Sequence, residues 1–393
     1  MFILIKKRDL LISFCISFFM LWLNIHTTSS DKTANDCEVI TEENVDDCIR
    51  LNHIQVLGTH NSYKLAPTEK LAKLMNAESP GRAIGILYEH RPLIEQFSKL
   101  QIRQIELDIF ADPDGGLFAE PLGAIKSDDQ QFIRPYEMYQ PGYKVLHVQD
   151  TDYRSTCLTL QSCLLEVRQW SLNNPDHLPL AILIEVKDGT PDNRGDFSFQ
   201  EAVRVDESNI FDIDDEIWSV FDPNHVITPD EVRGNHTTLE EAILTDGWPA
   251  LAESRGRILF MLDNEGSHRD AYLSRSEILE NRVMFTSSEP GEPSAGFIKM
   301  NNALDGYELI HERVRAGYLI RTRSDIPAQE AISGDTTRRE NALNSGAQYI
   351  STDYPEPSPF GTGYIVTLPG TEGPARCNPV SAPPGCENYL ITE

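Results

Sequence analysis

The sequence predicts an α/β fold, a (β/α)8 barrel of the TIM type, and three observations lead to it. Short apolar runs rich in Val, Ile and Leu recur along the 393 residues. Stretches with helical spacing lie between most of them, which is the alternation of a parallel sheet covered by helices. The runs number eight, which is the number of strands that closes a small barrel.

Most of these runs end in a polar residue, as expected for buried strands that open into a site. A further run at 296–300 is either the sixth strand or a hairpin partner to it. Helical spacing is clearest at 158–172, 239–251, 304–316 and 328–345. The eight expected strands are 54–57, 104–109, 145–148, 181–186, 258–262, 283–285, 318–320 and 349–351.

Two long segments, 111–142 and 189–256, are rich in Pro, Gly and Asp, and each follows an expected strand. In a βα barrel such segments lie on the C-terminal face, where sites are built. No repeat or linker indicates a second domain. We therefore expect one domain over 31–393, with its barrel core at about 50–355 and a C-terminal tail held by cysteines.

Residues 1–30 have the pattern of a signal peptide. A basic flank at 6–8 precedes an apolar run at 10–23, and small polar residues follow at 27–30, where cleavage could occur. The run is shorter than the roughly 20 residues of a membrane span, which favours export over the alternative of a retained N-terminal anchor. We expect a secreted, extracellular protein, periplasmic in a Gram-negative host.

Loss of the signal would remove Cys15 and leave six cysteines in close pairs. In an exported chain, such pairs predict local disulfides. No compact Cys or His set typical of a zinc site occurs. The expected bridges are Cys37–Cys48, Cys157–Cys163 and Cys377–Cys386.

The formal net charge is −27. This argues against nucleic acid as a partner, because its binding depends on Lys and Arg neutralising phosphates. It also argues against long-range attraction to an anionic membrane. The oligomeric state is not indicated.

Residues whose side chains can bind a metal ion or transfer a proton lie at or near the C-terminal ends of the first four expected strands, which form the catalytic face of a barrel. Each alone is commonly structural: a lone histidine is often a core residue, and a lone glutamate an ion-pair partner. A chance origin would need six such residues to fall at four successive strand ends. They are His60 and Asn61 after the first strand, Glu106 and Asp108 in the second, His147 in the third and Glu185 in the fourth.

The carboxylates predict a metal site. Glu106 and Asp108 have i, i+2 spacing, so both point to one side of a strand. They would repel each other unless a cation lay between them. Glu185 adds a third anionic oxygen and Asn61 a neutral one, and such an all-oxygen set suits a hard cation such as Ca²⁺.

Together these elements resemble the X-box barrel of phosphoinositide-specific phospholipases C, and most closely the calcium-dependent group of bacteria and some microbial eukaryotes. The resemblance covers about residues 50–355. It rests on Gly58-Thr59-His60-Asn61-Ser62-Tyr63, Glu106-Leu107-Asp108, His147 and Glu185, with further matches at 247–249, 255–257, 321–323 and 351–355.

The resemblance implies a barrel of the PLC-like phosphodiesterase superfamily. It implies that His60 donates a hydrogen bond to the phosphoryl group in the transition state, and that His147 is the general acid for the leaving glycerol oxygen. The implied calcium ligands are Asn61, Glu106, Asp108 and Glu185.

The implied reaction is attack of the inositol 2-hydroxyl on phosphorus, with one of the carboxylates or an adjacent group as base. It would give a cyclic phosphodiester and diacylglycerol, so the partner is a phospholipid or other phosphodiester, met at a membrane surface. Lys187 and Arg321 are placed to bind the remaining phosphate charge, or else to close structural salt bridges.

Three other functions are open. A glycerophosphodiester phosphodiesterase acting on soluble, deacylated head groups shares the barrel and the paired histidines. A barrel glycosidase would need acids at two strand ends flanking a sugar, which Arg321 and Arg323 fit badly. A non-catalytic binding barrel does not explain why both histidines and all four ligands are present, and the fold alone decides none of this.

Overall fold

The computed structural model describes residues 37–393. The chain divides into two units, Met1–Glu38 and Val39–Glu393, and the second forms the barrel. The expected signal peptide at 1–30, with Cys15, lies outside the described residues. Within the described part of the chain, none of the helices combines the length and apolar character needed to cross a bilayer.

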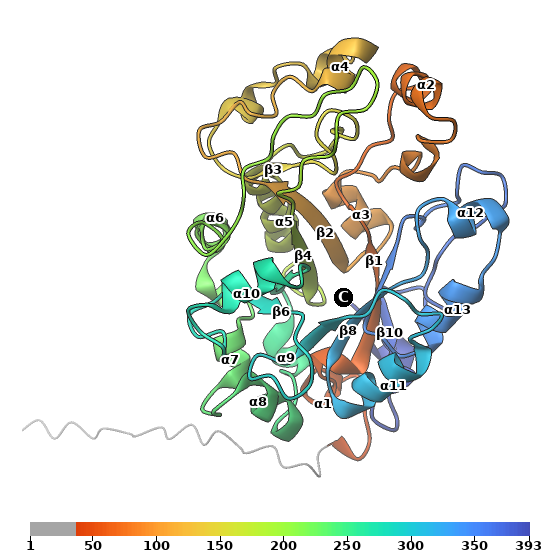
Figure 1. Ribbon diagram of the computed structural model, residues 1–393. Coiled ribbons are helices and arrows are strands. Elements are labelled where there is room, and N and C mark those ends of the chain that lie inside the picture. Colours follow the sequence, from red (N-terminus) through yellow and green to blue (C-terminus); the bar gives the residue numbers. More distant parts are fainter. Residues whose placement is uncertain (1–36) are drawn as a thin grey trace, which may run out of the picture. The chain divides into compact units, whose positions relative to one another are not determined.

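Eight parallel strands form the barrel in chain order (Figure 1). β1 pairs with β9 on one side and with β2 on the other, and a parallel bridge between Ser287 and Phe297 joins β6 to β7. The strands are buried, as their apolar runs predict. They are β1 (Ile54–Thr59), β2 (Gln104–Phe110), β4 (Leu180–Val186), β5 (Ile258–Leu262), β6 (Met284–Thr286), β7 (Phe297–Lys299), β8 (Leu319–Arg323) and β9 (Tyr349–Thr352).

The helices surround the strands, and local signals set their ends. α5 begins after the N-cap Thr159, whose hydroxyl accepts from the Ser162 N–H. The helix expected over 328–345 is two helices, because Gly334 ends the first in a left-handed conformation (φ 72°). The helices are α1 (Val45–Cys48), α2 (Glu69–Glu78), α3 (Leu93–Lys99), α4 (Leu122–Ser127), α5 (Leu160–Asn173), α6 (Asp212–Val220), α7 (Pro229–Arg233), α8 (Leu239–Thr245), α9 (Leu251–Ser254), α10 (Ser267–Leu273), α11 (Tyr307–Ala316), α12 (Gln329–Ser333) and α13 (Thr337–Asn344).

The expected third strand at 145–148 is wrong. Only β3 (Lys144–Val145) forms there, a short antiparallel strand on β2 and outside the barrel path. The run is apolar for another reason: Leu146 packs with Phe110, Phe118 and Met138 in a separate hydrophobic cluster. The third barrel strand is therefore β4, and the run at 296–300 supplies the sixth, β7, parallel to β8.

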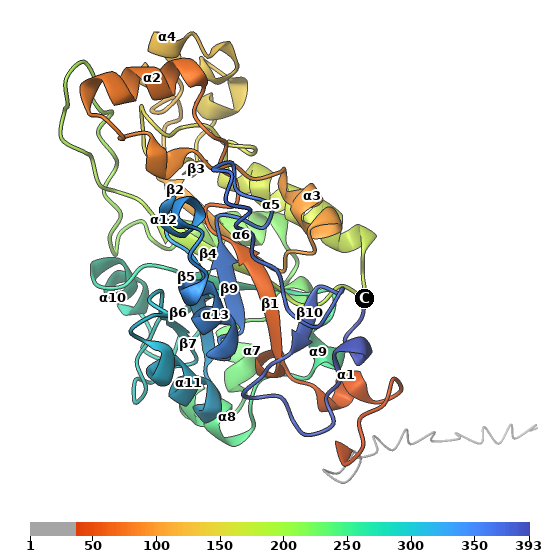
Figure 2. The ribbon, with the colours of Figure 1, turned by 90° about the vertical axis from the view of Figure 1, so that its right-hand side faces the viewer.

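The segment 111–142 lies where the sequence predicts. It carries α4, and Figure 2 shows α2 and α4 together beyond the ends at which β1 and β2 finish. The other long segment, 189–256, meets that expectation only in part. Phe197 packs near α2 and α4, but the later helices return to the opposite end, where the Leu251 N–H donates to the Ile49 carbonyl.

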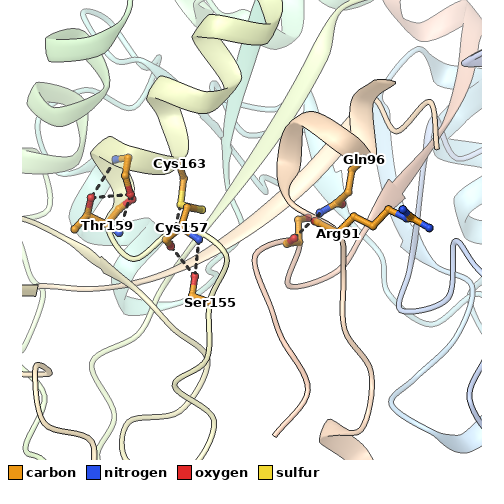
Figure 3. The surroundings of a disulfide bond; sticks show 8 residues. Arg91, Gln96, Ser155, Cys157, Thr159 and Cys163 are labelled. Carbon is orange, nitrogen blue, oxygen red and sulfur yellow. Dashed lines mark hydrogen bonds between the residues drawn. A yellow bond between two sulfur atoms is a disulfide. The ribbon is translucent and has the colours of Figure 1, made fainter. Parts of the chain in front are cut away.

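Two of the expected disulfides are present as predicted, Cys157–Cys163 and Cys377–Cys386. Cys37 and Cys48 are each disulfide-bonded as well. Figure 3 shows the first bridge at the start of α5, where the Ser155 hydroxyl donates to the Cys157 carbonyl (2.6 Å). This bridge ties the helix to the loop that precedes it.

We expect removal of the Cys377–Cys386 bridge to lower stability modestly. The bridge closes a short loop next to β10 (Ala375–Cys377), which pairs antiparallel with β1. Loop entropy for so short a closure gives a loss of about 2–3 kcal/mol in the free energy of unfolding for Cys377→Ser/Cys386→Ser. Urea denaturation with matched m-values measures it, and an unchanged midpoint would contradict it.

Candidate active site

Three carboxylates meet at the C-terminal ends of two neighbouring barrel strands. Glu106 and Asp108 alternate along β2, and Asp108 stands opposite Glu185 in the parallel register of β4. Oxygen atoms of the three side chains lie within 4.8 Å of one another. The grouping expected from the i, i+2 spacing is therefore present, although β4 is the third barrel strand and not the fourth.

Burial disfavours ionisation of Glu106 and Asp108, the two carboxylates on β2. Glu106 and Asp108 are 2% and 0% exposed. Burial raises the pKa of Glu106 to about 7. Burial, followed by the charge of Glu185, raises the pKa of Asp108 well above its usual value. A cation among the three carboxylates would favour their charged forms.

Oxygen atoms without hydrogen-bond donors complete the group. Asn61 has φ 49°, a left-handed conformation that asparagine tolerates, and its amide nitrogen donates to the Tyr88 hydroxyl (2.9 Å). Among the described residues, neither Asn61 Oδ1 nor Asp108 Oδ1 has a hydrogen-bond or ion-pair partner, although both are buried, and the buried Oδ2 of Asp108 has only the ion pair with Lys187 (3.3 Å). Unpaired buried oxygens are costly, and an oxygen-only set fits Ca²⁺.

Basic side chains already balance part of this charge. Lys187 Nζ lies 2.6 Å from Glu185 Oε1 and 3.3 Å from Asp108 Oδ2. Arg321, which is 1% exposed, donates to Glu106 Oε2 and, at 3.1 Å, to Ser351 Oγ. Arg321 thus makes the structural ion pair that the sequence left open. Phosphate binding by Lys187 and Arg321 stays a prediction.

His60 follows β1 and is held on both ring edges. Its Nδ1 lies 2.7 Å from Asp353 Oδ1, and its Nε2 lies 3.1 Å from Arg323 Nη1 and 3.6 Å from Glu106 Oε1. Burial, followed by the charge of Arg323, lowers the pKa of His60 to about 3. Although burial alone raises it, Arg323 and His60 hold the pKa of Asp353 to about 2. The imidazole is therefore neutral, with its proton on Nδ1 and a lone pair on Nε2 that accepts from Arg323.

His147 lies on a tight loop after β3 and not on a barrel strand. The loop is closed by backbone bonds between Val148 and Asp152. His147 Nδ1 lies 2.7 Å from Asp152 Oδ2, and the ring is 29% exposed. No hydrogen bond to its Nε2 forms within residues 37–393, so this nitrogen is available to a substrate.

Sequence reasoning named both histidines but missed their carboxylate partners. Asp353 directly follows a barrel strand, which is a signal for a site residue. Arg323 lies two residues after Arg321 and so faces the same side of β8. Asp152 is buried and only five residues from His147, but nothing in its local pattern distinguishes it from its neighbour Asp150.

Comparison with known proteins assigns the family. The family model "Phosphoinositide phospholipase C, Ca2+-dependent" matches residues 49–379, whereas no curated protein matches. One similar solved structure is a calcium-dependent phosphoinositol-specific phospholipase C from Pseudomonas sp, with 13% identity and a TM-score of 0.49 over 84% of this chain and 95% of that one. Another is a Ca²⁺-dependent phosphatidylinositol-specific phospholipase C from Streptomyces antibioticus, with 17% identity and a TM-score of 0.47 over 78% of this chain and 96% of that one. A glycerophosphoryl diester phosphodiesterase from Parabacteroides distasonis is more distant, with 12% identity and a TM-score of 0.29 over 84% of this chain and 98% of that one. The chain belongs to the Ca²⁺-dependent phosphoinositide phospholipase C family, and it is a calcium-using phosphoric diester hydrolase.

Proposed function

We propose that this enzyme cleaves the glycerol–phosphate bond of phosphatidylinositol-type lipids outside the cell. The observation that carries the proposal is the pair of histidines, each bonded through Nδ1 to a buried carboxylate, at the end of the barrel that holds the three-carboxylate group. A phosphodiester transition state gains negative charge and expels an alkoxide. The site can stabilise this charge and can supply a proton to the alkoxide.

His147 acts as the general acid in this proposal. In its protonated form, Nδ1–H is donated to Asp152, and Nε2–H faces the leaving oxygen. As the bond from phosphorus to the glycerol oxygen breaks, the Nε2 proton passes to that oxygen and diacylglycerol leaves. Histidine suits this exchange because its ordinary pKa lies near neutrality.

The inositol 2-hydroxyl is the nucleophile. Its oxygen forms the new bond to phosphorus, and its proton passes to a carboxylate of the group or to Nε2 of His60. The first possibility is the better supported, because the Nε2 lone pair of His60 already accepts a hydrogen bond from Arg323 and the pKa of His60 is lowered to about 3. Donation from Nε2 to a phosphoryl oxygen, in turn, would need a second proton on the ring. The product is a cyclic phosphodiester, open to later hydrolysis.

Asn61, Glu106, Asp108 and Glu185 are the proposed ligands of the calcium ion. When bound, Ca²⁺ supplies positive charge that stabilises the phosphoryl oxygens in the transition state. Arg323, which donates to both His60 and Asp353, adds positive charge next to His60.

Exposed apolar and aromatic side chains support binding of the enzyme to a membrane surface. Ile125, Tyr136 and Tyr139 are 49%, 75% and 45% exposed on the segment 111–142 at the C-terminal end of the barrel. Tyrosine is favoured at membrane–water interfaces. Given the net charge of −27, this contact would not depend on attraction to anionic lipid.

Disulfides support an extracellular location, because they persist in oxidising compartments. The signal peptide expected at 1–30 would direct export. N-terminal sequencing of the protein from the culture medium tests both, and an intact Met1 in the cell fraction alone would contradict them.

A panel of phosphodiesters with and without calcium tests the activity. We expect cleavage of phosphatidylinositol in vesicles, with a cyclic inositol phosphate and diacylglycerol as products, and loss of this activity in excess EGTA. The panel should include glycerophosphoinositol and lysophosphatidylinositol at matched concentration.

Cleavage restricted to the deacylated, soluble diester would favour the glycerophosphodiesterase alternative. Full activity in EGTA would contradict the role of the carboxylate group. No turnover of any diester would favour the binding barrel.

A further inference from the structure

Lys64, which lies four residues after His60, is a lysine in the protein interior. It is fully buried, and lysine is almost never so unless it is paired. Its Nζ donates to the Ile86 carbonyl (2.9 Å) and, at 3.4 Å, to those of Leu65 and Tyr88. The Tyr88 ring centroid is 4.7 Å away. These contacts hold the ammonium group from one side.

Asp152 forms the ion pair with this ammonium group. Its Oδ1 is 3.2 Å from Lys64 Nζ, and its Oδ2 is the atom bound to His147 Nδ1. Oδ1 is buried and makes no hydrogen bond within the described part of the chain, so Lys64 is the cation that compensates it. Asp152 thus links Lys64 to His147, one oxygen to each.

The backbone holds both ends of this link in register. Lys64 and Ser155 form an antiparallel bridge, and the Thr156 N–H donates to the Tyr63 carbonyl (2.7 Å). One step further on, Cys157 is bridged to α5. Backbone bonds therefore join the segment after β1 to the segment that follows the loop of His147.

We propose that Lys64 is a positioning residue for the general acid, acting through Asp152. Lys64 keeps the Asp152 carboxylate ionised and oriented, so that Asp152 binds the Nδ1 proton of His147 and directs Nε2 to the leaving oxygen. A carboxylate that orients an imidazole in this way selects its tautomer. The inference rests on the proposed role of His147. Lys64 itself touches no reacting atom.

Lys144 offers a matched control. It is also fully buried, and its Nζ lies 3.3 Å from Asp112 Oδ2. It donates to the carbonyls of Gln140 (2.6 Å) and Gly142 (2.9 Å). Lys64 and Lys144 thus have similar burial, charge pairing and carbonyl contacts, but within residues 37–393 no histidine is bonded to Asp112.

The test compares Lys64→Met with Lys144→Met on two substrates. One is phosphatidylinositol, with a poor leaving group, and the other is an aryl inositol phosphodiester, whose phenolate leaves without a proton. For Lys64→Met we expect kcat on the lipid to fall about 10–100-fold, by analogy with the loss of a partner that orients a metal-bound histidine, with KM unchanged and the aryl substrate little affected. Lys144→Met should slow both substrates alike or neither. The ¹⁵N NMR signals of the His147 ring should show a changed tautomer in Lys64→Met only.

Equal losses on both substrates in Lys64→Met, or the same selectivity in Lys144→Met, would overturn the inference. If Lys64→Met does not fold, Asp152→Asn carries the same test, because it removes the link and should reproduce the leaving-group selectivity; equal losses there would also overturn it. The variant His147→Ala distinguishes a failure of the role of Lys64 from a failure of the role of His147. Selectivity in His147→Ala but not in Lys64→Met refutes only the inference, whereas no selectivity in His147→Ala refutes the proposed acid itself.

Discussion

Replacing His147 with alanine is expected to slow cleavage of phosphatidylinositol by about 10²–10⁴-fold, the usual contribution of general acid catalysis. The same variant should slow an aryl phosphodiester far less, because a phenolate is a stable leaving group. The ratio of the two rates, measured at saturating calcium, is the result to compare with the unchanged enzyme. Equal losses on both substrates would remove His147 from the acid role.

His60→Ala and His311→Ala are the controls. If His60 assists attack or stabilises the phosphoryl oxygens, its loss should slow both substrates by similar factors. His311 lies on the outer helix α11, stacked on Tyr307, and its loss should slow neither. Selectivity in His60→Ala with none in His147→Ala would mean that the two histidines have exchanged roles.

Asp108→Asn is expected to weaken calcium binding by more than about 100-fold, the upper range for loss of a group that only supports a metal ligand. Asp108 offers two buried oxygens, of which Oδ1 has no partner and Oδ2 only the ion pair with Lys187. The change removes one of these two carboxylate oxygens and the negative charge. Isothermal titration calorimetry after EGTA treatment measures the affinity. Calcium should also raise the Tm of the unchanged enzyme and not of the variant, because a ligand stabilises the state that binds it.

Asp214→Asn is the matched control for this change. Asp214 is also a buried carboxylate, bonded to Tyr272 (2.7 Å) on the outer part of the barrel. Its loss should alter stability but not calcium affinity. Unchanged affinity in Asp108→Asn would contradict the assigned ligand set, and activity lost with affinity retained would assign Asp108 to catalysis alone.

The three-carboxylate group could be predicted from the sequence because its geometry is local to the strands. Alternation along β2 puts Glu106 and Asp108 on one side whatever the rest of the fold does. Parallel neighbours end at the same edge, which brings Glu185 opposite Asp108. These consequences of strand geometry need no knowledge of distant contacts.

The third strand could not be predicted in this way. A four-residue apolar run at 145–148 looks the same whether it enters the barrel or a satellite cluster, since both bury Leu146. What distinguishes a barrel strand from a segment of a satellite cluster is the strand with which it pairs, and tertiary packing determines that pairing. His147 could still be named as a candidate, because its polar character within an apolar run does not depend on the element that carries it.

The carboxylate partner of His60 depends on closure of the barrel. Asp353 meets His60 across 293 positions of sequence, a separation at which no periodic pattern carries information. Arg323 likewise joins this pair only because β8 and β9 lie side by side. Sequence spacing therefore predicts candidates at strand ends but not which of them touch.

The two histidine–carboxylate pairs should form at different times when the chain folds. The His147–Asp152 contact spans five positions and costs little loop-closure entropy. The His60–Asp353 contact requires β1 to pair with β9, which lies far along the sequence, and such non-local pairing slows folding. Catalytic activity regained during refolding should therefore lag behind the His147 loop and report the moment at which the ring closes.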